Sequence, residues 1–242
     1  MRPTVKPKLP VPPALLAIAV AAWMASPLVS ASATPAAEAL DRLKSGNARF
    51  AADAVAGQPV GQARRSELAK GQAPYAIVLS CADSRVPPEI IFNTGLGELF
   101  VVRAAGEVAD RSVMASIEYG AEHLHSPLLV VMGHESCGAV KAAMEAKASL
   151  GPNLDYLIKA IRPAIEQTKD VDEKAQLRAA IMANVEQVIN DMLGRSAILK
   201  HMAGEGSLQI VGAFYELESG RVQFSKPVAV ARAATTDHAE RK

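Results

Sequence analysis

The chain has 242 residues, and its 26 basic side chains nearly balance its 25 acidic ones. This balance argues against a nucleic-acid-binding protein, which would carry a clearly basic face. Half of the residues are hydrophobic but only 4% are aromatic. A composition rich in aliphatic side chains favours helices packed on a buried sheet. The function must therefore be sought in a specific site.

The N-terminus has the pattern of an export signal. Basic side chains precede an uncharged apolar stretch at residues 13–29, and the small residues Ala31-Ser32-Ala33 follow it. This order predicts cleavage after Ala33. A retained membrane anchor is the alternative, but the stretch is short for a span and contains Pro27. We expect the mature protein to be periplasmic or secreted, with no membrane contact after cleavage.

The rest of the chain alternates helical and strand patterns. Apolar residues spaced three or four apart predict helices at residues 37–52, 63–69, 112–123, 138–148, 154–168 and 172–193. Short apolar runs between turn residues predict strands at residues 76–80, 98–103, 127–133, 207–217 and 222–224. This alternation predicts an α/β fold with a mostly parallel central β-sheet flanked by helices. The turn at Ser219-Gly220 predicts an antiparallel edge strand near the C-terminus.

Two short motifs directly follow two of the expected strands. They are C-A-D-S-R at residues 81–85 and H-E-S-C-G at residues 134–138. The C-terminal ends of parallel strands meet at one edge of a sheet, so Cys81, His134 and Cys137 converge if these strands are neighbours. Two thiolates and one imidazole are good ligands for Zn²⁺, and three protein ligands leave a position for water, as in catalytic sites.

Spacing alone leaves other interpretations open. Cys81 and Cys137 are the only cysteines in the chain. In an exported protein, two cysteines usually form a disulfide. A non-catalytic zinc-binding or redox-sensing module built on the same two thiols is a further alternative.

The residues of both motifs resemble the signature motifs of the β-class carbonic anhydrases. The resemblance covers nearly the whole mature chain, including residues 43–50, 71–74, 97–106, 116–119 and 206–217. The chain departs from the family's common pattern at Ala104 and Glu107, where asparagine is frequent. We therefore expect residues 1–33 to be a signal peptide and residues 34–242 to form a single β-carbonic-anhydrase-like catalytic domain.

The resemblance implies a carbonic anhydrase (carbonate dehydratase), a lyase that reversibly hydrates CO₂ to bicarbonate and a proton by metal-bound hydroxide. One Zn²⁺ per chain would be held by Cys81, His134 and Cys137. Asp83 would accept a hydrogen bond from the hydroxide, and Arg85 would hold Asp83 away from the metal. In some family members this aspartate instead becomes a fourth ligand, which closes the site.

The resemblance also implies the residues of the substrate pocket. Gln72 corresponds to an amide that hydrogen-bonds the substrate. Val86 and Ala105 would line the apolar part of the pocket. Gly138, which has no side chain, would let the start of its helix approach the zinc.

Part of the pocket is expected from a second subunit. In this family, the positions of Phe100 and Tyr119 contribute to the CO₂ pocket of the neighbouring subunit. The resemblance thus implies a homodimer or a dimer of dimers.

Two expectations concern the subtype of the enzyme. Val78 stands where bicarbonate-inhibited members carry a tryptophan, so we expect an open, water-bearing site. A hydrolase of carbon disulfide or carbonyl sulfide shares the scaffold and is the alternative enzyme. Access to the pocket, rather than the motifs, would distinguish these gases.

Overall fold

The computed structural model describes residues 33–55 and 57–231. Residues 1–32, which contain nearly all of the expected signal peptide, lie outside these ranges, so the leader stays a prediction. Within the described residues, no helix has both the length and the apolar character that crossing a membrane requires.

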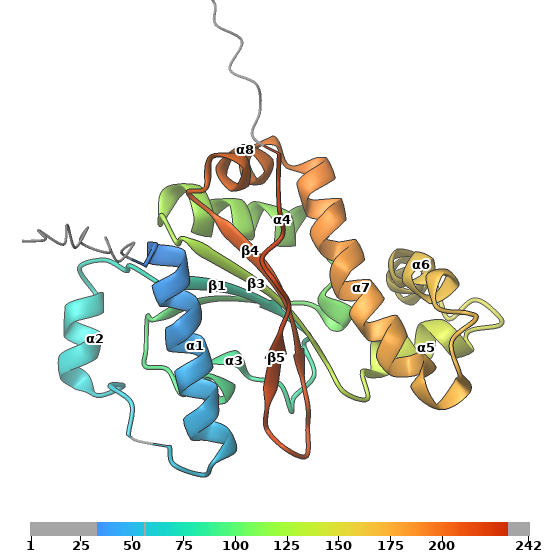
Figure 1. The fold of residues 1–242 in the computed structure, drawn as a ribbon, viewed down its shortest axis with the longest axis horizontal. Helices are drawn as coiled ribbons and strands as arrows, with labels where there is room; N and C mark the ends of the chain where they lie inside the picture. Colours follow the sequence, from blue (N-terminus) through green and yellow to red (C-terminus); the bar gives the residue numbers. More distant parts are fainter. Residues whose placement is uncertain (1–32, 56, 232–242) are drawn as a thin grey trace, which may run out of the picture. The chain divides into compact units, whose positions relative to one another are not determined.

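A five-stranded sheet forms the centre of the fold, with the strand order β2-β1-β3-β4-β5 (Figure 1). The strands are β1 (Ala76–Ser80), β2 (Leu99–Arg103), β3 (Leu128–His134), β4 (Gln209–Tyr215) and β5 (Val222–Phe224). The first four pair in parallel, and β5 pairs antiparallel with β4. The predicted α/β fold, with its mostly parallel sheet and antiparallel edge, is confirmed.

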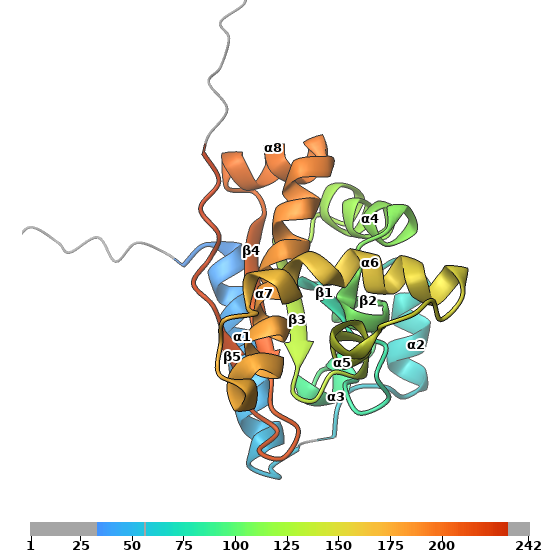
Figure 2. The same ribbon diagram turned by 90° about the vertical axis from the view of Figure 1, so that its right-hand side faces the viewer.

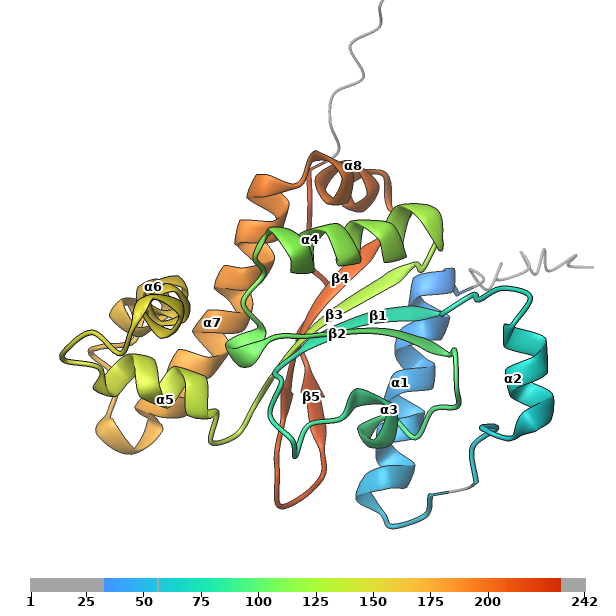
Figure 3. The same cartoon turned by 180° about the vertical axis from the view of Figure 1, so that it is seen from behind.

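Helices cover both faces of this sheet. They are α1 (Pro35–Ala51), α2 (Gln62–Leu68), α3 (Pro88–Ile91), α4 (Arg111–Glu118), α5 (Gly138–Glu145), α6 (Pro152–Gln167), α7 (Glu173–Arg195) and α8 (Ala197–Glu205). Helix α1 crosses in front of the sheet in Figure 1, whereas α4 is in front when the fold is seen from behind in Figure 3. Helices α5 and α6 lie together beside α7, as Figure 2 also shows.

Alternation along the strands divides the core into two faces, because successive strand side chains point to opposite sides. In β1, Val78 packs in the cluster that contains Leu43 of α1. Its neighbours Ile77 and Leu79 pack instead with residues of α4, α7 and α8, such as Ile117. Every residue of β1 and β3 is buried, which explains why these strands are continuous apolar runs in the sequence.

The fold differs from the expected elements in several places. Helices α3 and α8 were not predicted, and the helix expected at residues 112–123 ends at Glu118 and continues as a π-helical turn, Tyr119–His123. Gly46 lies on the buried face of α1, and a Cβ there would overlap the carbonyl oxygen of Phe92. The glycine therefore permits the close approach of α1 to the chain at the end of α3.

Candidate active site

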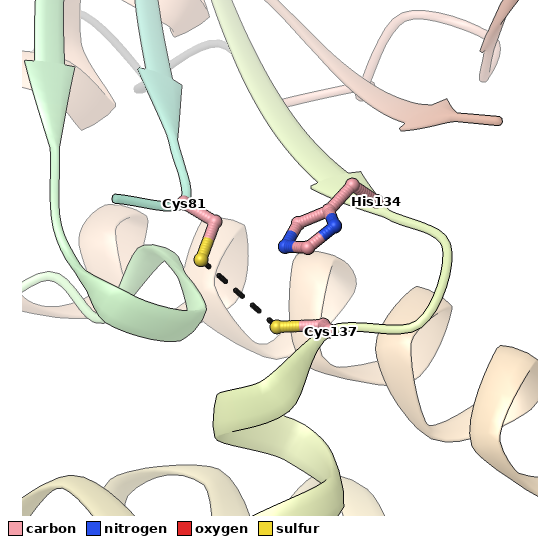
Figure 4. A group of neighbouring side chains, drawn as sticks. All are labelled: Cys81, His134 and Cys137. Carbon is pink, nitrogen blue, oxygen red and sulfur yellow. Dashed lines mark hydrogen bonds between the residues drawn. The ribbon is translucent and has the colours of Figure 1, made fainter. Parts of the chain in front are cut away.

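The two motifs are brought together by strand order. Strands β1 and β3 are direct neighbours, and Ser80 pairs with Met132 in the parallel register. Cys81 follows β1, His134 is the last residue of β3, and Cys137 precedes the first turn of α5. Figure 4 shows the three side chains pointing toward one another from these elements.

The potential ligand atoms of Cys81, His134 and Cys137 all lie within 4.8 Å of one another, and all three residues are buried. The two sulfur atoms are 4.0 Å apart, far beyond the roughly 2.05 Å of a disulfide bond. Both cysteines are free thiols. The disulfide interpretation is therefore wrong for this structure.

His134 is oriented so that one ring nitrogen stays available. Its Nδ1 lies 2.9 Å from the carbonyl oxygen of Glu135, so the tautomer with a proton on Nδ1 donates this hydrogen bond. Its Nε2 is buried and has no hydrogen-bond partner. A buried nitrogen without a partner is unfavourable unless something else binds it.

This donor set fits zinc. Two sulfurs bound to one tetrahedral zinc would lie roughly 3.8 Å apart, given Zn–S bonds of about 2.3 Å. The observed separation of 4.0 Å is close to that value. The unpaired Nε2 of His134 supplies the third lone pair in the same place.

The two thiols share one hydrogen bond and differ in acidity. The pKa of Cys81 is lowered, chiefly by the hydrogen bond shared with Cys137 and also by the Gly106 N–H, although burial opposes the shift. The pKa of Cys137 is raised, chiefly by the same bond to Cys81 and by burial. Because zinc binds thiolates, metal binding would release the protons that this pair of thiols retains.

Asp83 is clamped by Arg85. The backbone N–H and Nε of Arg85 donate to Oδ1, each at 2.9 Å, and Nη2 donates to Oδ2 at 2.7 Å. These bonds hold the pKa of Asp83 well below its usual range. Oδ2 also lies 3.9 Å from Nε2 of His134. An ionised carboxylate thus stands beside the ligand group while engaged with Arg85.

Arg103, at the end of β2, has a structural role that the sequence motifs did not reveal. It donates to the carbonyl oxygens of Cys81, at 3.1 Å, and Asp83, at 2.6 Å. It thereby braces the loop that carries the first cysteine. The sequence could indicate this role only once the pairing of β1 with β2 is known, because that pairing places Arg103 opposite Ser80, next to Cys81.

Comparison with known proteins identifies the family. Residues 76–222 match the family model described as carbonic anhydrase. Carbonic anhydrase 2 of Mycobacterium tuberculosis is 41% identical over 191 residues, which cover 74% of this chain and 87% of the relative. The chain belongs to the β-carbonic anhydrase family. Its enzymatic activity is the reversible hydration of CO₂ to bicarbonate, a reaction for which this family uses zinc.

Solved structures agree with this membership. Coccomyxa β-carbonic anhydrase in complex with acetazolamide has a TM-score of 0.63 and 28% identity, covering 69% of this chain and 78% of its own. A tetrameric β-carbonic anhydrase from Sordaria macrospora has a TM-score of 0.62 and 27% identity, covering 68% of this chain and 87% of its own. The relatives named here are carbonic anhydrases, and nothing in these comparisons supports the gas-hydrolase or non-catalytic alternatives.

Three of the pocket residues expected of a β-carbonic anhydrase lie on the segments that carry the ligands. Val86 is fully buried after the C-A-D-S-R loop. Ala105 is exposed and precedes Gly106, whose N–H donates to Cys81 Sγ. Gly138 is exposed at the first position of α5, and a Cβ there would meet no atom within 4 Å. Open space therefore lies beside the residue that follows Cys137.

The other three expected residues lie away from the ligands of their own chain. Gln72 is exposed in the loop before β1, whereas Cys81 follows the other end of that strand. Phe100 pairs with Ile77, near the start of β1, and its ring centroid is 6.1 Å from that of Tyr119. The structure thus brings Phe100 and Tyr119 together, but not with the metal-binding group of the same chain.

Proposed function

We propose that the chain hydrates CO₂ at one zinc ion per chain, held by Cys81 Sγ, His134 Nε2 and Cys137 Sγ. The observation that carries the proposal is the buried, unpaired Nε2 of His134 facing two free thiols that lie 4.0 Å apart. Three protein ligands leave a position for water, which is the pattern of catalytic zinc sites. A bound zinc ion would lower the pKa of a water to about 7 and so supply a nucleophile near neutral pH.

Asp83 would orient the attacking water. Its Oδ2 accepts one hydrogen bond from Arg85 and retains a free lone pair, and it lies 3.9 Å from His134 Nε2. Because the pKa of Asp83 is held low by Arg85, the carboxylate remains an acceptor at neutral pH. Asp83 would therefore direct the lone pair of the water toward CO₂ rather than take its proton.

Apolar surface would hold the substrate. CO₂ has no net dipole, so a pocket bordered by aliphatic groups suits it better than a polar one. The side chains of Val86 and Ala105 and the open space at Gly138 border the ligand segments. Arg85 would keep Asp83 from closing the fourth position, because each carboxylate oxygen accepts from its guanidinium.

A stopped-flow CO₂ hydration assay tests this proposal. Purified protein should contain about one zinc per chain, hydrate CO₂, lose the activity when a chelator removes the metal and regain it when zinc is returned. Acetazolamide, which is bound in the Coccomyxa relative, is a suitable inhibitor control. Full hydration activity in protein shown to be metal-free would overturn the proposal.

We further propose that a dimer completes the pocket, with Gln72, Phe100 and Tyr119 supplied by the partner subunit. Tyr119 is 46% exposed beside the partly buried ring of Phe100, and an exposed aromatic side chain of this kind fits a contact between subunits. The strand β1 separates Gln72 from Cys81 of the same chain by its five residues, about 16 Å. The relative from Sordaria macrospora is tetrameric. Light scattering should therefore give the mass of a dimer or tetramer, and a monomer with full activity would contradict this arrangement.

We propose export to the periplasm or the exterior after cleavage following Ala33, on the basis of the N-terminal pattern alone. Mass spectrometry of the protein expressed with its full leader should find a mature chain beginning at Thr34 in the exported fraction. An intact N-terminus in the cytosolic fraction would refute the export signal.

A further inference from the structure

A hydrogen-bond relay links the buried face of helix α7 to the sulfur of Cys81. Asn184 of α7 is fully buried, and its Nδ2 donates to the carbonyl oxygen of Gly106 at 2.8 Å. The backbone N–H of Gly106 in turn donates to Cys81 Sγ at 3.3 Å. Asn184 therefore binds the carbonyl group of a glycine whose N–H group donates to the Cys81 sulfur.

The backbone at this glycine is in a conformation that needs such support. Gly106 has φ +59 and the next residue, Glu107, has φ +44, and a glutamate rarely adopts the left-handed region. A Cβ on Gly106 would lie 2.8 Å from Ile161 Cδ1, so another residue there would push the end of the Ile161 side chain aside. Strained backbone of this kind persists only where the surroundings hold it in place.

Both amide hydrogens of Asn184 are used at this turn. Nδ2 also donates to Oε1 of Glu107 at 3.3 Å, and the Glu107 side chain is fully buried. Turning the amide around would place Oδ1 against the Gly106 carbonyl oxygen, which can only accept, so that contact fixes the orientation of the amide. Asn184 is thus the side chain that ties Gly106 and Glu107 to α7.

We propose that Asn184 is a positioning residue of the metal centre, which holds the Gly106 carbonyl group and so keeps the backbone of this turn placed for the Gly106 N–H to donate to the Cys81 thiolate. The inference rests on the proposed role of Cys81 as a zinc ligand. A hydrogen bond to a ligating thiolate draws electron density from the sulfur and fixes its direction, and such supporting groups affect both metal affinity and electronic structure. Asn184 would touch neither substrate nor metal and would act only through the backbone of the turn at Gly106.

The first test compares Asn184→Leu with a matched core control, Val188→Ala. Val188 is also buried on α7, but its core cluster contains neither cysteine. Asn184→Leu should weaken zinc binding about tenfold in chelator competition. In the Co²⁺-substituted protein, it should move the thiolate-to-cobalt charge-transfer band to lower energy, because the sulfur loses a hydrogen bond. Val188→Ala should lower thermal stability but leave both quantities unchanged.

A swap variant separates the relay from simple packing. In Asn184→Asp combined with Glu107→Gln, measured at a pH where the new carboxyl group is ionised, the two side chains can still pair, but the amide donor is now on residue 107 and the Gly106 carbonyl loses its partner. The proposal expects the swap to reproduce the affinity loss and the spectral shift of Asn184→Leu. Wild-type affinity and spectrum in the swap would show that only the side-chain pair matters and would overturn the proposal.

Three further outcomes would test the positioning role of Asn184 or the cysteine ligands. If Asn184→Leu does not fold, Asn184→Ser, which is small and polar, is measured by the same two readouts, and wild-type values would overturn the proposal. If the wild-type Co²⁺ protein has no thiolate charge-transfer band, the assignment of cysteine ligands fails instead. If that band is present and neither Asn184 variant shifts it, only the positioning role fails.

Discussion

The two ends of strand β1 differ in what they offer to a substrate. At the C-terminal end, Cys81 is buried with the other two ligand residues. Arg103 donates to the carbonyl oxygen of Cys81, and Arg85 donates to the carboxylate of Asp83. At the N-terminal end, Gln72 is exposed and the nearby Tyr119 presents almost half of its surface. The metal-binding group at the C-terminal end is thus complete within a single chain. The groups at the N-terminal end lie away from the metal-binding group of their own chain. This contrast is the basis of the proposal that one chain binds the metal and a second chain completes the pocket.

The largest expected effect comes from removing a ligand at the C-terminal end. Cys137→Ser should reduce CO₂ hydration to the background rate and zinc content to well below one per chain, because a serine hydroxyl is a poor zinc ligand compared with a thiolate. Stopped-flow kinetics and metal analysis measure both. A variant that retains zinc and activity would show that the metal is not bound at this end.

A smaller effect is expected from Asp83→Asn, which keeps the shape of the side chain but removes its charge. Loss of a well-placed polar group that orients the nucleophile should lower kcat/KM about 100-fold, with zinc content unchanged. Asp41→Asn is the matched control, since Asp41 is an exposed carboxylate on α1 paired only loosely with Lys44. An equal effect in both variants would remove Asp83 from the mechanism.

The N-terminal end is tested by Phe100→Ala, which should lower kcat/KM about tenfold by removing apolar pocket surface. Mixing Phe100→Ala with Cys137→Ser protomers sharpens the comparison. In a mixed dimer, one site has all three ligands from one chain and the intact Phe100 from the other. Activity should therefore rise above that of either variant alone after subunit exchange. No recovery, despite mixed dimers detected by native mass spectrometry, would place Phe100 at the site of its own chain.

The last expected effect concerns stability, rather than catalysis, at the buried end. Burial raises the pKa of Glu107 to about 8, and the Cys81 charge adds to the rise, whereas an unfolded glutamate has a pKa of about 4.3. The folded chain therefore favours the protonated carboxyl group of Glu107. Its contribution to the free energy of unfolding is complete below about pH 4 and is lost as the pH rises toward 8. Glu107→Gln cannot titrate and should gain, relative to the wild type, about 4 kcal/mol between pH 5 and 9.

Urea unfolding at several pH values, with the same zinc content in both proteins, measures this difference. Glu67→Gln is a suitable control, because Glu67 is a surface carboxylate paired with Arg64 and should change the pH dependence little. Parallel pH profiles for the wild type and Glu107→Gln would mean that Glu107 does not carry a raised pKa.

Much of the fold was accessible from sequence patterns. The strand expected at residues 76–80 is β1 without any shift, and the strand expected at 222–224 is β5, since short apolar runs between turn residues are local signals. The helices that the sequence did not predict lack such local signals. Helix α8 follows α7 after a single capping residue, Ser196, whose hydroxyl accepts from Leu199 N–H. Helix α3 has only four residues, too few for any periodicity.

The sequence by itself determined the ligand types, because the thiols, the imidazole and the Asp83–Arg85 pair lie in two short motifs directly after apolar runs. Only the tertiary structure decided that these motifs meet, since the neighbouring positions of β1 and β3 result from long-range strand pairing. It also decided which groups support them. Asn184 and Gly106 are 78 residues apart, and a contact across that distance follows from how α7 packs on the sheet, which no local pattern encodes.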